Sequence, residues 1–315
     1  MPGAYAHITL VNELRKTQNL DAAGLPPQAS GALLAYFKFC ELGAVSPDYP
    51  YMTVLDPAAR PWADDMHGMR TGDVVKAGIV RVKALQGEKQ RKCFAWLLGY
   101  AAHVVADVVI HPVVFLKVGE YADHQMEHRV CEMNEDAWVF HQRMNLGAIG
   151  LSAYLESHIG QCCNPAHKDR LDADIKEVWE SVLREKYPDE WGDHKPDMDQ
   201  WHRNFRKIVG KVASHGDALW PMGRHVTDGL GLTYPKFNEV DQHYTNGLEV
   251  PVPAGTTQPY DPIFDKAVAS TLRVWKLLAD GVFSGDSQYQ ASIGNWSLDT
   301  GKNENGELVF WEVTV

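Results

Sequence analysis

The chain has 315 residues, of which 45% are hydrophobic and 23% are charged, and it carries a formal net charge of −11 at pH 7. This length and composition are those of a soluble globular protein with enough apolar residues to bury a large core. The acidic balance disfavours an extended nucleic-acid-binding surface, although bound metal ions would add positive charge that the formal count omits. The five cysteines are few, odd in number and not arranged in CxxC pairs, which favours a reducing compartment over a disulfide framework.

The N-terminal stretch MPGAYAHITLVNELRKTQ contains no basic region, long apolar run or small-residue cleavage site. We therefore expect no secretory signal and a cytoplasmic location. The most apolar segment, residues 93–115, is nearly long enough to span a bilayer. Because it contains two His, one Asp and one Pro, a buried core helix is the favoured interpretation.

Helical periodicity dominates most of the chain and predicts helices over residues 5–18, 30–42, 73–86, 89–111, 120–141, 145–160, 171–186, 197–214 and 261–282. Between the second and third of these, AVSPDYPYMTVLDPAARPWADD contains four prolines, which predicts a rigid, irregular loop. Near the C-terminus, YQASIGNWSL and LVFWEVTV flank DTGKNENGE, which predicts a hairpin with an Asn-Gly turn. The expected fold is mainly α, with a small β-hairpin element at the C-terminus.

The functional residues are concentrated in the first half of the chain. We expect residues 1–150 to form a helical core that carries the functional site. Residues 151–315 are expected to form a helical elaboration with the C-terminal hairpin, within the same domain.

A polar stripe interrupts the most apolar helix, GYAAHVVADVVIHPVVF (residues 99–115), where His103, Asp107 and His111 recur at four-residue intervals. Positions i and i+4 share one face of an α-helix, so His103 and Asp107 can bind one ion together. His103 and His111 lie roughly 12 Å apart along the axis, which is too far to share an ion. If all three are ligands, the site holds more than one metal ion, and the two carboxylate oxygens of Asp107 can bridge between ions.

Further candidate ligands lie outside this stripe. His128 and Glu132 form an HxxxE pair on the next predicted helix, where they can complete a site with His111. Asp48 lies in SPDYP, His67 in DDMHG and His7 in the first predicted helix. Each buried, unpaired polar group would cost a few kcal/mol, so either metal binding or a dense polar hydrogen-bond network must compensate. Metal binding is the favoured interpretation of the two.

Five pieces of the sequence, in order, carry a resemblance to a known family. They are AHITLVNEL, LGAVSPDYPY, DDMHG, HVVADVVIHP and HRVCE. The chain resembles the bacterial zinc-dependent phospholipase C family, which is related to the N-terminal domain of glycosylphosphatidylinositol-specific phospholipase D and to fungal zinc nucleases. The resemblance covers residues 1–140.

The resemblance implies a multi-helix phospholipase C/nuclease-like domain whose cluster of two or three Zn²⁺ ions hydrolyses phosphodiesters. It implies a first zinc held by Asp48, His67, His103 and Asp107, a second held by His111, His128 and Glu132, and a third held by His7 and Asp107. Asp48 would also orient or deprotonate the attacking water. The implied substrate is a phosphate ester, with phospholipid as one class and peripheral membrane contact as a compatible property.

Two departures from the family pattern bear on these expectations. Secreted members present a processed N-terminal residue, commonly Trp, to the third zinc, whereas this sequence begins Met1-Pro2-Gly3. The nucleases carry an Arg shortly after the position of Asp48, where this chain has Tyr49 and Tyr51. We therefore expect no nucleic-acid partner, and the oligomeric state is not predicted. The alternative functions are a single-strand nuclease or phosphomonoesterase on the same site, or a non-catalytic metal-stabilised scaffold.

Overall fold

The expected mainly α fold is confirmed in a computed structural model of the protein, which describes residues 3–52, 58–68, 70–146, 149, 152–215 and 234–311. The helices of the first half are α1 (Ala4–Leu14), α2 (Thr17–Ala23), α3 (Pro27–Ala35), α4 (Phe37–Val45), the 3-10 helix η1 (Ser46–Met52), α5 (Arg60–Gly68), α6 (Thr71–Lys83), α7 (Gly87–Val118) and α8 (Gln125–Met144). The later α-helices are α9 (Ser152–Ser157), α10 (Ala173–Lys186), α11 (Pro188–Asp193), α12 (Met198–His215), α13 (Tyr260–Ala279) and α14 (Tyr289–Ser292).

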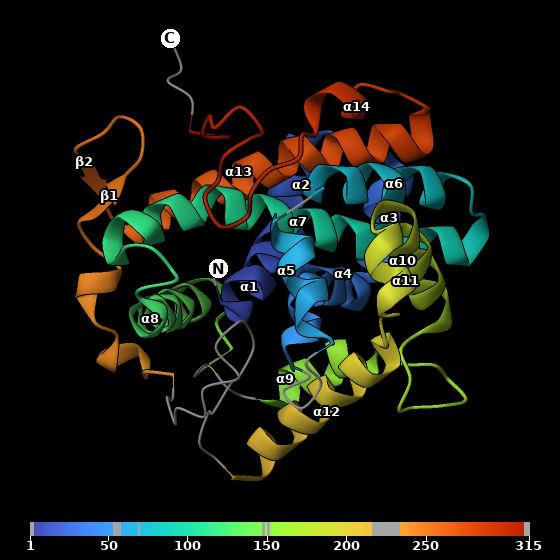
Figure 1. The fold of residues 1–315 in the computed structure, drawn as a ribbon, viewed down its shortest axis with the longest axis horizontal. Helices are drawn as coiled ribbons and strands as arrows, with labels where there is room; N and C mark the ends of the chain where they lie inside the picture. The colour runs from blue at the N-terminus through green and yellow to red at the C-terminus, as the bar shows by residue number, and fades with distance from the viewer. Residues whose placement is uncertain are drawn as a thin grey trace.

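Helix α7 is the centre of the molecule. It crosses the middle of the structure, and α13 runs alongside it (Figure 1). Every residue from Cys93 to Val114 is buried, including the polar stripe. Within the described chain α7 is long and apolar enough to cross a membrane, but its apolar window is entirely covered by the protein itself. The prediction of a core helix therefore agrees with the structure.

Helices α4 and α7 pack with their backbones in unusually close approach. A Cβ atom added to Gly43 would lie 2.0 Å from the carbonyl oxygen of Trp96, and one added to Gly99 would lie 1.9 Å from that of Cys40. Only glycine fits at such a contact, because any larger residue would force the helices apart. This contact brings the carbonyl groups at the end of α4 next to the stripe on α7.

Several predicted boundaries were wrong in instructive ways. The helix predicted over 5–18 is divided into α1 and α2, and the helix predicted over 30–42 is divided into α3 and α4. The proline-rich segment is not wholly irregular, because η1 and α5 occupy much of it. Pro47 fits the first turn of η1 and Pro61 the first turn of α5, where an N–H donor is not needed, whereas Pro50 lies inside η1.

The β structure lies elsewhere than predicted. The antiparallel strands β1 (Leu248–Val250) and β2 (Thr256–Gln258) pair with each other, whereas residues 289–311 contain α14 and the isolated bridges Trp296↔Asn303 and Lys302↔Leu308. The Asn303 side chain accepts hydrogen bonds from the amides of Asn305 and Glu307, and these local bonds compete with a regular ladder. Residues 312–315 of the predicted second strand lie outside the described residues.

The two predicted segments of the chain contribute to the same buried hydrophobic cluster, in which α13 packs on α7. The division at residue 150 remains a prediction.

Candidate metal centre

Five of the eight predicted ligands converge on one buried point. His7 is carried by α1, Asp48 by η1, His67 by α5, and His103 and Asp107 by α7. None of these side chains is more than 2% exposed. Two groups of possible ligand atoms result, namely His7, His103 and Asp107, and Asp48, His67 and His103.

Four of these side chains, Asp48, His67, His103 and Asp107, approach one another at distances expected of metal ligands. The Nε2 atom of His67 lies 3.4 Å from Oδ1 of Asp48, 3.3 Å from Nε2 of His103 and 3.8 Å from Oδ2 of Asp107. The Nε2 atom of His103 lies 3.4 Å from the same oxygen of Asp107. Ligands arranged tetrahedrally at normal Zn–N and Zn–O bond lengths would be separated by roughly 3.3–3.5 Å. The separations of 3.3–3.4 Å match this value and that of 3.8 Å exceeds it, so these side chains fit ligands of a shared zinc ion.

Hydrogen bonds at the far side of each ring determine which nitrogen faces this point. Nδ1 of His67 donates to the carbonyl oxygen of Ala63 at 2.6 Å, and Nδ1 of His103 donates to that of Ala44 at 2.9 Å. A carbonyl only accepts, so in the neutral rings both Nε2 atoms carry lone pairs. Two lone pairs facing each other repel unless a cation lies between them. This arrangement is the common one for metal-binding histidines.

His7 and Asp107 form a second position beside this one. Nε2 of His7 lies 3.2 Å from Oδ1 of Asp107, and the His7 ring stacks on His103 with centroids 4.0 Å apart. Among the described residues, neither nitrogen of His7 and neither oxygen of Asp107 makes a hydrogen bond of acceptable geometry. Unsatisfied buried polar atoms are costly, and a cation between Nε2 of His7 and Oδ1 of Asp107 would satisfy these two atoms. The residues therefore fit a second ion beside the first.

Electrostatics favour a cation at this point. Burial tends to raise the pKa values of Asp48 and Asp107, but the neighbouring imidazoles outweigh it and hold both pKa values below the usual range. Burial lowers the pKa of His7, aided by His103, so His7 is neutral at pH 7. Burial tends to lower the pKa of His103, but Asp107 and Asp48 raise it overall. Two ionised carboxylates thus lie in a closed site. They favour positive charge there, which a proton on His103 can supply and a divalent ion can supply in its place.

A carboxylate from α8 fixes the helix that carries His7. Asp136 accepts hydrogen bonds from the backbone amides of Tyr5 at 3.3 Å and Ala6 at 2.8 Å, and from the hydroxyl of Tyr234 at 2.9 Å. It therefore caps the first turn of α1 in place of a local capping residue. A Cβ on Gly3 would lie 2.0 Å from this carboxylate, so glycine is needed there. This role of Asp136 was not predicted from the sequence.

The other three predicted ligands are buried but are not brought together in the same way. Within the described residues, His111, His128 and Glu132 do not form a group whose ligand atoms all lie within 4.8 Å. Nδ1 of His111 donates to the carbonyl oxygen of Leu298, and Nε2 of His128 donates to that of Gly119 at 2.8 Å. The nitrogens that bear lone pairs are therefore Nε2 in His111 and Nδ1 in His128. The assignment of a second zinc to these residues remains a prediction.

The groups near Asp48 serve structural roles. The buried hydroxyl of Tyr49 pairs with Nδ1 of His202 at 3.2 Å, and the hydroxyl of Tyr51 donates to Asp64 at 2.8 Å. Arg60 lies 3.9 Å from Asp64 at the surface, and Arg70 donates to the carbonyl oxygen of Lys186. Both of the nearest arginines thus have partners away from the five-residue cluster.

Comparison with known proteins agrees with this geometry. The family model described as zinc dependent phospholipase C matches residues 6–189, more than half of the chain, and extends beyond the 1–140 of the predicted resemblance. No curated protein and no solved structure gave a significant match. The matched range contains all five converging side chains and excludes everything after residue 189. The chain therefore belongs to the zinc-dependent phospholipase C family.

Proposed function

We propose that the protein is a phosphodiester hydrolase of the phospholipase C type that uses two or three zinc ions. The observation that supports this most strongly is the burial of Asp48, His67, His103 and Asp107 at one point, with ligand atoms 3.3–3.8 Å apart in the pairs that join them. His7 and Asp107 supply the adjacent position. His111, His128 and Glu132 are the proposed ligands of the remaining ion.

Bound zinc would supply two things, a lower pKa for the attacking water and stabilisation of the charge that develops on phosphate oxygens. Asp48 is the proposed general base. Its pKa is held low by the neighbouring histidines, so it is ionised, and a carboxylate that binds zinc through one oxygen can orient the water and accept its proton with the other. The carbonyl groups of Ala63 and Ala44 hold the rings of His67 and His103 with Nε2 directed toward the metal position.

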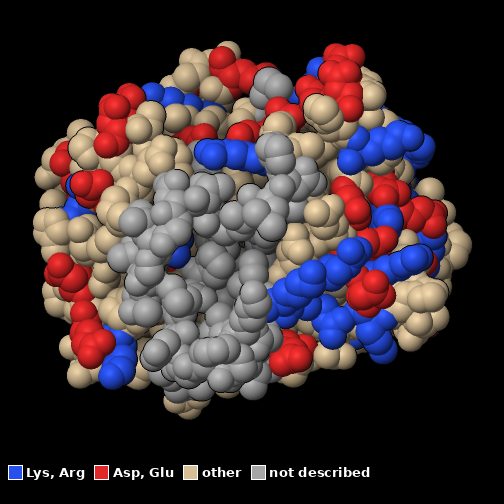
Figure 2. All heavy atoms as spheres, turned by 60° about the horizontal axis from the view of Figure 1, so that its bottom comes forward, with Lys and Arg blue, Asp and Glu red and all other residues tan. Residues whose placement is uncertain are grey.

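A phospholipid or related ester is the preferred substrate class, and a nucleic acid is not. Arg60 and Arg70 have other partners, so neither stands ready to assist phosphate transfer beside Asp48. On the face drawn in Figure 2, Lys and Arg lie interleaved with Asp and Glu over the described surface. A nuclease would be expected to present a more continuous basic surface.

Exposed apolar side chains support peripheral contact with a membrane. Phe115 and Leu116 at the end of α7 are each 41% exposed, and Met126 at the start of α8 is 38% exposed. They follow His111 and precede His128, so a lipid surface docked there would lie next to the proposed site. Vesicle sedimentation of wild type and Phe115→Ser/Leu116→Ser should show weaker binding by the variant, and equal binding would contradict this contact.

The proposed activity is tested with a chromogenic phosphodiester, with and without a chelator and with zinc added back. Hydrolysis that the chelator abolishes and zinc restores is expected. Asp48→Asn should retain most of the metal and lose roughly 10²–10⁴-fold in turnover. Equal turnover in Asp48→Asn and wild type would contradict the assignment of the base, and inactive, fully zinc-loaded wild type would favour the scaffold alternative.

The same protein assayed with a chromogenic phosphomonoester, a phosphocholine ester and single-stranded DNA would separate the remaining alternatives. We expect the phosphocholine ester to be hydrolysed fastest. Faster hydrolysis of the monoester or of DNA would replace the phospholipase assignment.

A further inference from the structure

We propose that residues 294–311, the C-terminal clamp, are a positioning element of the metal centre that sets the tautomer and orientation of His111. The amide of Leu298 donates to the carbonyl oxygen of His67 at 3.0 Å, and the carbonyl oxygen of Leu298 accepts from Nδ1 of His111. One peptide segment thus joins the helix of a ligand in the five-residue cluster to a ligand of the proposed second zinc. The clamp lies outside residues 6–189, which the family model matches.

The bond to Leu298 determines the chemistry of the His111 ring. Because a carbonyl oxygen only accepts, the proton of neutral His111 must reside on Nδ1, and the lone pair is left on Nε2. Partners of this kind fix ring orientation and raise ligand basicity, and their loss weakens metal binding by roughly 10–100-fold. His111 is 4% exposed, so water cannot easily replace the carbonyl.

The clamp is anchored on both sides of Leu298. The hydroxyl of Thr71 donates to the carbonyl oxygen of Trp296 at 2.7 Å and accepts from its amide at 2.9 Å. The indole of Trp311 donates to the carbonyl oxygen of Val109 on α7 at 2.9 Å. Trp296, Leu298 and Trp311 are all buried. A segment held by the start of α6 at one end and by α7 at the other can define the place of the Leu298 carbonyl between them.

Pro112 makes room for the clamp on α7. It follows His111 and has no amide hydrogen, so the carbonyl of Val108 lacks its usual helical donor. Gly301 occupies this place, and a Cβ there would lie 2.4 Å from Cγ of Pro112 and 2.5 Å from the carbonyl oxygen of Val108. Gly306, in the same clamp, also has a positive φ, but a Cβ there would meet nothing within 4 Å.

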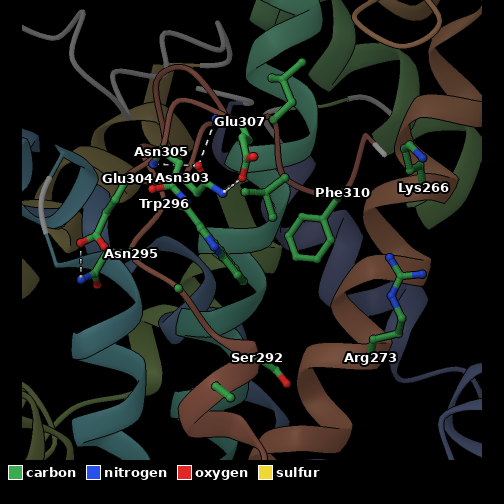
Figure 3. A pocket seen from close by; sticks show the side chains of 14 residues that line it. Lys266, Arg273, Ser292, Asn295, Trp296, Asn303, Glu304, Asn305, Glu307 and Phe310 are labelled. Carbon is green, nitrogen blue, oxygen red and sulfur yellow. Dashed lines mark hydrogen bonds between the residues drawn. The ribbon is translucent and has the colours of Figure 1, made fainter. Parts of the chain in front are cut away.

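The outer side of the clamp faces away from the metal centre. It forms one wall of a cavity of about 1220 Å³, whose other wall includes Lys266 and Arg273 of α13. Figure 3 shows Trp296, Asn303 and Glu307 across this cavity from the two cations, with Phe310 between them. Gly306→Ala adds a methyl group in open space, so it is the matched control for Gly301→Ala, with similar backbone strain and no contact with α7.

The first readout is the ring ¹⁵N spectrum of full-length protein labelled at histidine, recorded after metal removal, with the His111 signal identified by its absence in His111→Asn. Wild type and Gly306→Ala should show His111 as the Nδ1–H form. Gly301→Ala should show a mixture of tautomers or an averaged signal. An unchanged Nδ1–H signal in Gly301→Ala would overturn the proposal.

The second readout is zinc affinity. The quantity compared is the dissociation constant of the most weakly bound zinc ion in each protein. We expect it to be at least tenfold higher in Gly301→Ala than in wild type and Gly306→Ala. Equal affinities in all three proteins would contradict the proposal. The role of His111 as a ligand rests on the proposed function, but the tautomer measurement does not. If zinc binds nowhere, the proposed function fails, while the tautomer result still decides whether the clamp sets the ring.

If Gly301→Ala does not fold, Thr71→Val is the second variant. It keeps the side-chain shape and removes both hydrogen bonds to Trp296. The same loss of the Nδ1–H signal is expected, and its persistence would contradict the proposal.

Discussion

The two halves of the polar stripe on α7 differ in what holds them. His103 and His111 lie on the same buried face of the same helix, and each donates its Nδ1 proton to a backbone carbonyl. The carbonyl that holds His103 belongs to Ala44 of α4, inside the range that the family model matches. The carbonyl that holds His111 belongs to Leu298, far outside it. The ligands around His103 converge within the described chain, whereas those around His111 do not.

This difference shows that neighbouring ligands on one helix can depend on unrelated parts of a chain. The inner half of the stripe, His103 and Asp107, is built where α1, η1, α5 and α7 meet. The outer half, His111, depends on a segment that joins α7 only after almost 200 further residues. Perturbations of the two halves should therefore have separable effects.

The largest effect is expected from Asp107→Asn. Asp107 faces His103 and His67 with one oxygen and His7 with the other, so its charge supports both positions of the inner half. We expect a loss of at least roughly 10³-fold in turnover and of both inner ions, measured by phosphodiester hydrolysis and elemental analysis. Retention of wild-type zinc content would show that the carboxylate charge is not central.

Acid stability should reveal a supporting contact of the inner half. Burial lowers the pKa of His202, the partner of Tyr49 next to Asp48, to about 4. As the pH is lowered from about 6.5 to 4, the unfolded chain takes up a proton at this residue and the native state does not. The free energy of unfolding therefore decreases as the pH is lowered. The loss should approach about 3 kcal/mol below pH 4.

The control for this effect is His202→Asn, whose amide can still pair with Tyr49. The free energy of unfolding, measured in denaturant from pH 8 to pH 4 on metal-free protein, should fall less steeply in the variant. Parallel pH curves for the two proteins would rule out His202 as the titrating group.

His111→Ala tests the outer half. We expect it to remove at most one zinc ion and to lower turnover by roughly 10–100-fold, far less than Asp107→Asn does. Zinc titration and kinetics on the two variants in parallel provide the measurement. If His111→Ala emptied the whole site, the two halves would not be separable.

The smallest effect is expected from Asp136→Ala, which removes the cap of α1. The loss of two backbone hydrogen bonds should cost about 1–2 kcal/mol of stability. Asp136→Asn, which keeps an acceptor oxygen, should lose less. Denaturant unfolding of the three proteins gives the comparison, and equal stability of Asp136→Ala and wild type would mean that the cap does not hold α1.

The inner half of the stripe could be predicted from the sequence because its two residues lie close together in the chain. The four-residue spacing of His103 and Asp107 determines their shared face on any helix. The convergence of His7, Asp48 and His67 followed from the resemblance, not from spacing, because their approach depends on how α1, η1 and α5 pack. The role of Leu298 had no signal at all, since a backbone carbonyl can come from any residue and nothing in the sequence identifies its partner.

The C-terminal hairpin was predicted from alternating residues and an Asn-Gly turn, which are features of a free hairpin. In the structure its tryptophans and Leu298 instead make contacts with α7, with the start of α6 and with the end of α5. Tertiary packing outweighed local β preference there. Gly306 does adopt a positive φ of 81°, but Asn305 does not, so the turn is not the type I′ turn that an Asn-Gly pair favours.

The most direct test of the central claim is the zinc content of untagged wild-type protein, purified without chelator or metal-affinity resin and measured by elemental analysis. The geometry of the inner half together with the proposed outer site predicts two to three zinc ions per chain. Zero or one would mean that the buried histidines and aspartates form a polar network and not a metal cluster, and would contradict the proposed hydrolase.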